Sequence, residues 1–505
     1  MEFDQDLADE QEAALQYMLR PESDNAALLA WDMGLGKTRT GVLLVKAQNT
    51  ECVLVVIPLQ TMESWKETVE QEHPSLPVFV INSSKPGKAA LAGFQWRSHG
   101  AYLITHEYWE RLAWVKELVP KRRKADEDTY RKVWSDVWSR PDFTLIYDES
   151  HRSANSGNWT FRALMNLDPG VFKVAMSGTF AGDSFDGAYG ASKWLWPHRT
   201  DILPNDVFAW RRIWAETKYN KWAPRNEKVV GEKDEGAFVS ALPCYIRMES
   251  DEPPALLRTV TVDLYPEQRR VYDELDNRMV AWINDNPLVA EYDITKRARQ
   301  RQTTLAMPTL TFDDETGELL EVTFDDDAES VKTDQLIAEI EGRGQLGGLL
   351  IKEPLILLTD SQKFARLLTA RLNAHFGGDV AREWSGPISR NQRKQTKADF
   401  IEGRVEYLVG VQAAMGTGTD GLQHRSHIVV FMSLSDRRIH NEQGIGRVRR
   451  KGQKHQTHAI TLIAQDTVDS GQASKQMTDA VKMAKSMRAK HRREQEEARR
   501  ERART

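Results

Sequence analysis

The residues with the clearest capacity for chemistry lie in the stretch WDMGLGKT, residues 31–38. Short apolar runs flank it on both sides, which places it where a strand is expected to turn into a helix. Gly34 and Gly36 let the backbone approach an anion, so successive N–H groups and the positive end of the helix can face a β-phosphate. Lys37 would then reach the β- and γ-phosphates, and the hydroxyl of Thr38 would ligate Mg²⁺. The stretch therefore predicts a loop that binds ATP.

This loop departs from the full G-x-x-x-x-G-K-[ST] pattern, because Trp31 stands where the first glycine would be. An ordinary glycine-rich turn is the alternative interpretation. Leu35 completes the loop residues predicted to contact ATP. Upstream, Gln11 lies on a predicted helix of residues 5–20, where its amide could read the adenine edge. A glutamine that faces solvent is the alternative there.

A pair of carboxylates follows a second apolar run, in the sequence FTLIYDESH. Ligands bind at the carboxyl ends of strands in open α/β sheets, so this position suits a catalytic pair. We expect Asp148 to hold Mg²⁺ through its water shell and Glu149 to polarise the water that attacks the γ-phosphate. Such a pair alone usually lies on a plain surface, but together with the phosphate loop it indicates an ATP hydrolysis site.

Small hydroxylated residues end another predicted strand, FKVAMSGTF. Ser177, Gly178 and Thr179 could bond to the carboxylate loop and sense whether the γ-phosphate is present. We predict that they couple the nucleotide to movement. Thr105, at the end of the predicted strand AYLITHEYW, is a candidate contact for nucleic acid.

The glycine- and threonine-rich segment of residues 406–423, EYLVGVQAAMGTGTDGLQ, reads as a strand that leads into a loop. Thr417 and Thr419 could bond to a backbone phosphate of nucleic acid, and Asp420 could couple that contact to the nucleotide. A flexible loop without this role is the alternative.

Composition limits the classes of protein that this chain can represent. With 505 residues, 40% apolar and 28% charged, it is long enough for two or three soluble domains. It has no apolar run of membrane-spanning length, so we expect no membrane anchor and a cytoplasmic location. Cys52 and Cys244 stand far apart in apolar contexts, which favours reduced buried thiols over a disulfide or a zinc site. The net charge of -5 hides basic clusters at residues 120–124, 449–454 and 485–505.

Three motifs resemble a known family when they are taken in order. GLGKT, DESH and SGT resemble motifs I, II and III of the DEAD/DEAH-like helicases of superfamily 2. DESHRSAN and the later segments CYIRMES and VTVDLYPEQRRVY resemble one branch, the Swi/Snf-type DNA translocases, in a compact form similar to bacterial or phage members. This chain departs from the residues typical of that branch at three places. It has Trp31-Asp32 in place of Asp-Glu, Ser150 in place of Ala, and Gly444 in place of Ala.

The segment NEQGIGRVRRKGQ, residues 441–453, resembles motif VI of the same branch. Arg447 and Arg450 fall three apart on a predicted helix, so they would share one face and reach a γ-phosphate held by the other lobe. Arginine suits this role because its planar fork is always charged. Gln443 is a candidate ATP contact, and Arg449 lies off the shared face.

The resemblance implies an α/β fold of two tandem RecA-like parallel-sheet lobes, with helical insertions and an ATP site in the cleft between the lobes. The expected divisions are a first lobe at 1–245 with insertions at about 110–141 and 185–245, a linker or protrusion at 246–350, a second lobe at 351–472, and a basic helical tail at 473–505. Residues 308–326 read as a β-hairpin with DETGE at its turn.

The resemblance also implies an activity, with ATP and Mg²⁺ as cofactors. It indicates a nucleic-acid-stimulated ATPase that moves along duplex or branched DNA in replication, recombination or repair, holding mainly the DNA backbone. A strand-separating DNA or RNA helicase is the second hypothesis, and an ATP-gated clamp that recruits partners is the third. We expect a monomer in a bacterial or phage-infected cell, with a protein partner for targeting left open.

Overall fold

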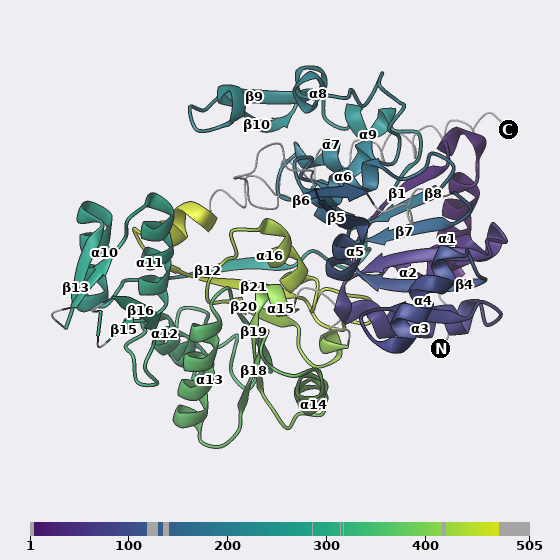
Figure 1. Cartoon of the computed structure of the whole chain (residues 1–505). Coiled ribbons are helices and arrows are strands. Elements are labelled where there is room, and N and C mark those ends of the chain that lie inside the picture. Colours follow the sequence, from purple (N-terminus) through teal and green to yellow (C-terminus); the bar gives the residue numbers. More distant parts are fainter. Residues whose placement is uncertain are drawn as a thin grey trace. The chain divides into compact units, whose positions relative to one another are not determined.

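The computed structural model describes residues 5–118, 130–134, 141–284, 286–313, 315–316, 318–415 and 421–473. These residues divide between two compact units, with the boundary between Ser250 and Asp251 (Figure 1). Each unit has its own parallel sheet and its own buried core. The predicted α/β class with two parallel sheets is therefore confirmed.

The first unit is built around a seven-stranded sheet in which all neighbouring strands are parallel. In spatial order the strands are β11 (Tyr245–Met248), β1 (Ala26–Trp31), β8 (Phe172–Met176), β7 (Thr144–Asp148), β2 (Cys52–Ile57), β4 (Gly100–Thr105) and β3 (Val78–Ile81). Every residue of β1, β2 and β7 is buried. Strands covered on both faces need continuous apolar runs, and this explains why these strands could be recognised in the sequence.

Nine helices of the first unit lie within the described residues. They are α1 (Gln5–Met18), α2 (Lys37–Ala47), α3 (Met62–Glu72), α4 (Lys85–Gln95), α5 (His106–Ala113), α6 (Trp159–Met165), α7 (Gly187–Lys193), α8 (Val207–Trp214) and α9 (Ala237–Ala241). Cys52 and Cys244 are free and buried, as predicted. Within the described residues, no helix combines the length and the hydropathy needed to cross a membrane.

Two antiparallel hairpins depart from the predicted helical insertions. β5 (Trp114–Leu118) pairs with β6 (Tyr130–Trp134), so the prediction of a helical insertion at about 110–141 is wrong at these two strands, although α5 is helical up to Ala113. Both strands contain aromatic and β-branched residues, which favour strands over helices. In the region 185–245, β9 (Ala215–Tyr219) and β10 (Glu227–Glu232) form a hairpin among the helices α7, α8 and α9.

The second unit has a six-stranded sheet, again parallel throughout. Its spatial order is β12 (Leu256–Val262), β21 (His458–Ala464), β20 (Ile428–Phe431), β17 (Leu355–Thr359), β19 (Tyr407–Val411) and β18 (Ala381–Trp384). The described helices are α10 (Pro266–Arg278), α11 (Asp293–Leu305), α12 (Val331–Ile340), α13 (Gln362–Phe376), α14 (Arg390–Ile401), α15 (Gln412–Met415) and α16 (Arg438–Ile445).

Two small hairpins complete this unit, β13 (Val280–Ile283) with β14 (Asn286–Val289), and β15 (Thr309–Phe312) with β16 (Leu319–Thr323). The latter is the hairpin predicted at 308–326. β12 lies in the segment that we assigned to a linker, yet it pairs along its whole length with β21. The second sheet therefore begins about a hundred residues earlier than the predicted start at 351. Similarly, β11 pairs with β1 and extends the first sheet beyond residue 245.

Candidate functional site

The predicted phosphate loop joins β1 to α2, as expected. Its glycines have left-handed backbone angles, with φ of 84° at Gly34 and 77° at Gly36, and Gly36 is the residue before the first turn of α2. A Cβ on Gly36 would lie 2.3 Å from Nε2 of Gln11, so the loop has no room for a side chain there. Lys37 donates to the carbonyl oxygens of Trp31 at 2.9 Å and Asp32 at 3.0 Å. Its ammonium group therefore bonds to the backbone of the same loop that is predicted to bind phosphate.

Gln11 is held against this loop from α1. Its side chain is buried, and its Oε1 accepts a hydrogen bond of 2.6 Å from Nη1 of Arg39. Among the described residues its Nε2 has no hydrogen-bond partner. The alternative of a glutamine that faces solvent is therefore wrong. A buried donor without a partner costs free energy, which is a reason to expect a ligand acceptor at this place.

A partly buried ion pair supports the other end of the loop. Nη2 of Arg247, on β11, lies 2.8 Å from Oδ1 of Asp32, and the backbone N–H of Ser250 donates to Oδ2 at 3.1 Å. Nη1 of Arg247 donates to the carbonyl of Ala30 at 2.6 Å. Asp32 is one of the two positions where the loop departs from the family pattern, and the arginine opposite it had no assigned role. We name these contacts the Asp32–Arg247 bracket.

The carboxylate pair lies at the end of β7, where it was predicted. Oδ2 of Asp148 accepts a hydrogen bond of 3.2 Å from Nε1 of Trp65, and Oδ1 accepts one of 2.9 Å from the backbone N–H of Glu149. Burial, and then the charge of Glu149, raise the pKa of the Asp148 carboxyl to about 6, while Lys37 opposes that rise. The phosphate-loop lysine and the carboxylate are thus close enough to interact.

Glu149 connects the carboxylates to the loop after β8. Its backbone has a φ of 52°, a strained conformation for a residue with a side chain. Its Oε2 lies 3.2 Å from Nδ1 of His151, which in turn lies 3.3 Å from Oγ of Ser177. The Ser177 hydroxyl also accepts from the backbone N–H of Thr179 at 3.2 Å. A Cβ on Gly178 would approach the carbonyl of Trp31 to 3.1 Å, so this loop packs closely on the phosphate loop.

The remaining predicted site residues make contacts that do not by themselves indicate a role, or lie outside the described residues. Oγ1 of Thr105 accepts from the backbone N–H of Tyr108 at 3.2 Å and so caps α5. Thr38 lies partly buried in the first turn of α2. Thr417, Thr419, Asp420 and the tail from residue 474 lie outside the described residues.

In the second unit, the arginines of the predicted motif VI are buried but not helical. α16 ends at Ile445, so the prediction that Arg447 and Arg450 share a helix face is wrong. They follow in turns, with Nε of Arg450 donating to the carbonyl of Gly446 at 2.7 Å. Gln443 lies buried on α16. Burial, followed by the charges of Arg450 and Arg447, lowers the pKa of Lys397 on α14, so positive charge gathers here.

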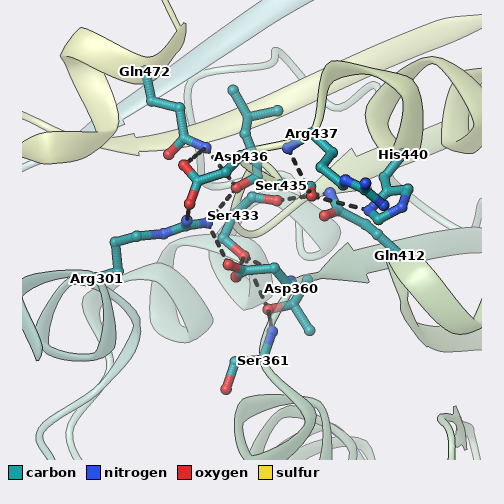
Figure 2. Close-up of polar contacts among 12 residues, drawn as sticks. Arg301, Asp360, Ser361, Gln412, Ser433, Ser435, Asp436, Arg437, His440 and Gln472 are labelled. Atoms are coloured by element: carbon teal, nitrogen blue, oxygen red, sulfur yellow. Dashed lines mark hydrogen bonds and ion pairs between the residues drawn. The ribbon is translucent and has the colours of Figure 1, made fainter. Parts of the chain in front are cut away.

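A polar network at the carboxyl ends of β17 and β20 was not predicted (Figure 2). Arg301 of α11 bonds to the carboxylates of Asp360 and Asp436, and it donates to the carbonyl of Leu434 at 2.5 Å. Nε2 of Gln472 reaches the same Leu434 carbonyl at 2.9 Å. The sequence of α11 is rich in arginine, but it does not reveal which carboxylates these arginines would meet. The network fixes α11 to the strand ends of the second sheet.

The residues that sequence reasoning missed are partners of residues that it found. Trp65 holds Asp148, Arg247 holds Asp32, and His151 connects Glu149 to Ser177. His151 could have been found, because it lies within the DESH motif. Trp65 carried no comparable signal.

The residues present fit ATP and Mg²⁺. The left-handed glycines present backbone N–H groups at the start of α2, and the buried Nε2 of Gln11 adds an unused donor. Among the described residues, no group of three or more His, Cys, Asp or Glu could hold a metal ion alone. Protein sites usually hold Mg²⁺ through one or two carboxylates together with water and substrate phosphates, and Asp148, at the end of β7, offers one such carboxylate.

Comparison with known proteins places part of this site in a family. Residues 10–180 match the family model of the SNF2-related domain. This part of the chain is therefore similar to SNF2-related domains. This range contains the phosphate loop, the carboxylate pair and Ser177, and it confirms the resemblance drawn from those motifs. The matched part ends before the second unit begins.

Individual relatives match over smaller parts of their own length. ATP-dependent helicase ULS1 of Saccharomyces cerevisiae is 25% identical over 219 residues, which are 37% of this chain and 13% of that protein. Protein CHROMATIN REMODELING 4 of Arabidopsis thaliana is 26% identical over 175 residues, 34% of this chain and 8% of that protein. Chromodomain-helicase-DNA-binding protein 1-like of Mus musculus is 28% identical over 160 residues, 31% of this chain and 16% of that protein. The chain thus spans less than a fifth of each relative.

Among solved structures, the Sulfolobus solfataricus SWI2/SNF2 ATPase core in complex with dsDNA covers 95% of this chain and 93% of its own, at 17% identity and a TM-score of 0.36. A score this low does not establish a shared fold. The fold assignment above rests on the two parallel sheets.

Proposed function

We propose that this chain is an ATP-dependent DNA translocase that moves along duplex or branched DNA. The observation that supports the proposal is that the predicted motifs of the first unit contact one another. Lys37 bonds to the backbone of the phosphate loop, and its charge lowers the pKa of Asp148. Glu149 contacts His151, which in turn contacts Ser177. These parts lie within the matched SNF2-related domain.

In this proposal, ATP supplies the phosphoryl group and Mg²⁺ neutralises its oxygens. Backbone N–H groups at Gly34 and Gly36 hold the phosphates, and Lys37 turns from the carbonyls of Trp31 and Asp32 toward them. Asp148 and Thr38 would hold Mg²⁺ beside these phosphates. Trp65 fixes one oxygen of Asp148 and the Glu149 backbone fixes the other.

Glu149 is the group that orients and polarises the attacking water. Its strained backbone and its contact with His151 hold the carboxylate in one place. Ser177, Gly178 and Thr179 then report the state of the site to the rest of the unit. The second unit would supply Arg447 and Arg450 to the γ-phosphate, where an arginine fork stabilises developing charge.

Movement on DNA would follow if hydrolysis alternately tightens and releases contacts with the backbone of one strand. Thr105, Thr417 and Thr419 stay the predicted contacts, with Asp420 as their link to the nucleotide. Backbone contacts carry little sequence information, so the activity should tolerate sequence and weaken with salt. Replication, recombination and repair produce branched DNA and are the proposed setting.

Two other functions fit some of the same residues. A strand-separating DNA or RNA helicase would be stimulated mainly by single strands or RNA. An ATP-gated clamp would bind nucleic acid without accelerated hydrolysis. The polymer that stimulates the ATPase separates the first two functions, and the absence of stimulation identifies the third.

A triplex-displacement assay on duplex DNA tests the proposal. The unmodified chain should displace the third strand only with ATP, and Lys37→Ala should abolish displacement while DNA binding persists. Lys46→Ala is a matched control, because Lys46 lies in the last turn of the same helix, far from the phosphate loop, and donates to the carbonyl of Glu72. Displacement by the Lys37→Ala variant at the normal rate would refute the assignment of the phosphate loop.

A further inference from the structure

The β9–β10 hairpin of the first unit ends in an ordered, solvent-exposed tip. We call residues 218–228 the hairpin tip. The backbone N–H of Asn220 donates to the carbonyl of Asn226 at 2.8 Å, and the N–H of Asn226 donates to the carbonyl of Ala223 at 2.8 Å. These bonds close the turn, so the side chains of the tip are displayed from a defined backbone. Figure 1 shows the hairpin beside α8 and apart from the parallel sheet of its unit.

The hairpin is anchored at its base, and Arg225 also anchors one side of its tip, where its Nη1 lies 4.0 Å from Oδ2 of Asp206. Ala215 is buried, and the backbone N–H of Lys233 donates to the carbonyl of Trp214 at 2.8 Å. Nearer the tip, the guanidinium of Arg225 lies 3.8 Å from the ring centre of Phe208 on α8. Changes to the most exposed side chains of the tip should therefore leave the fold of the unit intact.

Two aromatic rings of the tip are unusually exposed. Trp222 is 84% exposed and Tyr219 is 78% exposed, although most large aromatic side chains of this unit are buried. Nζ of Lys221 lies 4.8 Å from the centre of the Trp222 ring, so a cation and an open ring are presented together. Leaving two large rings in water forgoes the free energy of burying them, which points to a partner that covers them.

The charges of the tip indicate that this partner is anionic. The tip has four cations, Lys218, Lys221, Arg225 and Lys228, against one carboxylate, Glu227, in a chain whose net charge is -5. Lys218 and Lys228 are directly opposite each other across the hairpin. Like charges directly opposite each other destabilise a strand pair, so these two lysines lower the stability of the hairpin. An anionic partner would remove that cost.

Exposed aromatic rings interleaved with cations match single-stranded nucleic acid. Bases stack on the rings, and the phosphates between the bases meet the cations. Duplex DNA offers the phosphates but keeps its base faces covered, so it matches only the charges. An acidic protein segment would likewise use the cations and leave the rings uncovered.

We propose that the hairpin tip binds a single-stranded segment of nucleic acid, with Tyr219 and Trp222 stacking on its bases. This inference rests on the proposed function only in naming where such a segment occurs, namely at the branch of the DNA on which the chain acts. The tip would make the chain prefer forked DNA over blunt duplex. Stacking on one ring is worth roughly 5- to 150-fold in affinity.

The test compares binding to three labelled DNAs without ATP: a single strand of thymidines, a blunt duplex, and a fork with two single-stranded arms. In the double variant Tyr219→Ala/Trp222→Ala, fluorescence anisotropy should show at least tenfold weaker binding to the single strand and the fork. Binding to the blunt duplex should change less than twofold. Trp222→Phe should keep most of the affinity, because phenylalanine still stacks.

Trp96→Ala is the matched control, since Trp96 is 78% exposed on the same unit and lies outside the hairpin. It should bind all three DNAs as the unmodified chain does. A single strand that carries 5-iodouracil should also cross-link to the peptide that contains Trp222. Melting temperatures of the variants should agree within about 2 °C, because the changed side chains are exposed.

Equal losses on all three DNAs would make the tip a general contact and overturn the stacking proposal. Unchanged binding to every DNA would assign the tip to a different partner, such as a protein, and would overturn it as well. Because the assay needs no hydrolysis, these outcomes do not depend on whether the chain proves to be a translocase.

Discussion

Breaking the Asp32–Arg247 bracket should damage the ATP site without touching a residue that meets ATP. The test variant is Arg247→Ala, accompanied by Asp32→Asn and by the double variant. The side chain of Arg247 supplies two of the bonds that hold the loop from β11, one to the Asp32 carboxylate and one to the Ala30 carbonyl; the backbone N–H of Asp32 makes a third, to the carbonyl of Met248 at 3.0 Å.

The expected size of the effect follows from burial. The side chains of Arg247 and Asp32 are 10% and 24% exposed. Removing one partner of a fully buried, hydrogen-bonded ion pair costs about 3–5 kcal/mol. We expect about 3 kcal/mol here, because Asp32 is partly exposed and keeps the bond from the N–H of Ser250. For a unit of about 250 residues, 1 kcal/mol corresponds to roughly 2–4 °C in melting temperature, so we expect a loss of about 10 °C. The double variant should lose less, because no isolated charge remains.

Differential scanning calorimetry and titration with a fluorescent ATP analogue measure these effects. The melting transition assigned to the first unit should shift, and the affinity for nucleotide should fall at least tenfold because Asp32 belongs to the loop. Arg199→Ala is the control, since Arg199 and Asp201 form a pair at a similar 2.9 Å but are 36% and 62% exposed. An exposed pair is worth about 0–1 kcal/mol.

Two results would refute this reasoning. If Arg247→Ala melts and binds nucleotide as the unmodified chain does, the bracket has no structural role. If the double variant is as unstable as the sum of the two single variants, the two side chains do not interact energetically.

Four other substitutions test separate parts of the account. Glu149→Gln should lower the turnover number at least a hundredfold with ATP affinity retained, and normal steady-state turnover would remove it as the catalytic carboxylate. Arg450→Ala should cut turnover about a thousandfold with little effect on nucleotide binding; a selective loss of binding would argue against its role at the γ-phosphate. Gly36→Ala should weaken nucleotide binding at least tenfold, because its Cβ would meet Gln11 and its φ is 77°; calorimetric titration giving the same affinity would contradict this. Lys173 makes the stability depend on pH, because burial lowers its pKa from 10.5 to about 8 in the folded chain. Between pH 8 and 10.5 the folded chain has lost this proton while the unfolded chain keeps it, so the free energy of unfolding should rise with pH. Lys173→Met should therefore stabilise the chain by up to about 3 kcal/mol at pH 7, with the gain vanishing by pH 10.5 in denaturant titrations; a gain independent of pH would contradict the sign.

The sequence was most informative where local pattern and burial coincide. β1 and β2 are continuous apolar runs, and β7 has an apolar centre at residues 145–147, because both faces of the parallel sheet are covered. The residues at the ends of β1 and β7 and in the loops after them carry the chemistry. Contacts between distant residues could not be read in this way. Trp65 lies 83 residues from Asp148, and Arg247 lies 215 residues from Asp32.

The errors also have physical causes. The predicted helix of motif VI ends early because Gly444 and Gly446 weaken it, and Gly446 is its C-cap. Gly444 is required by packing, since a Cβ there would lie 2.6 Å from Cδ1 of Leu358. β12 was assigned to a linker because its partner, β21, lies about two hundred residues further along the chain.

The central claim is that duplex or branched DNA drives ATP hydrolysis by this chain. Its most direct test is the steady-state ATPase rate with no nucleic acid, single-stranded DNA, duplex DNA, forked DNA and RNA, each at two salt concentrations. The account predicts strong stimulation by duplex and forked DNA that weakens as salt rises. Stimulation by RNA alone, or by no polymer at all, would contradict it.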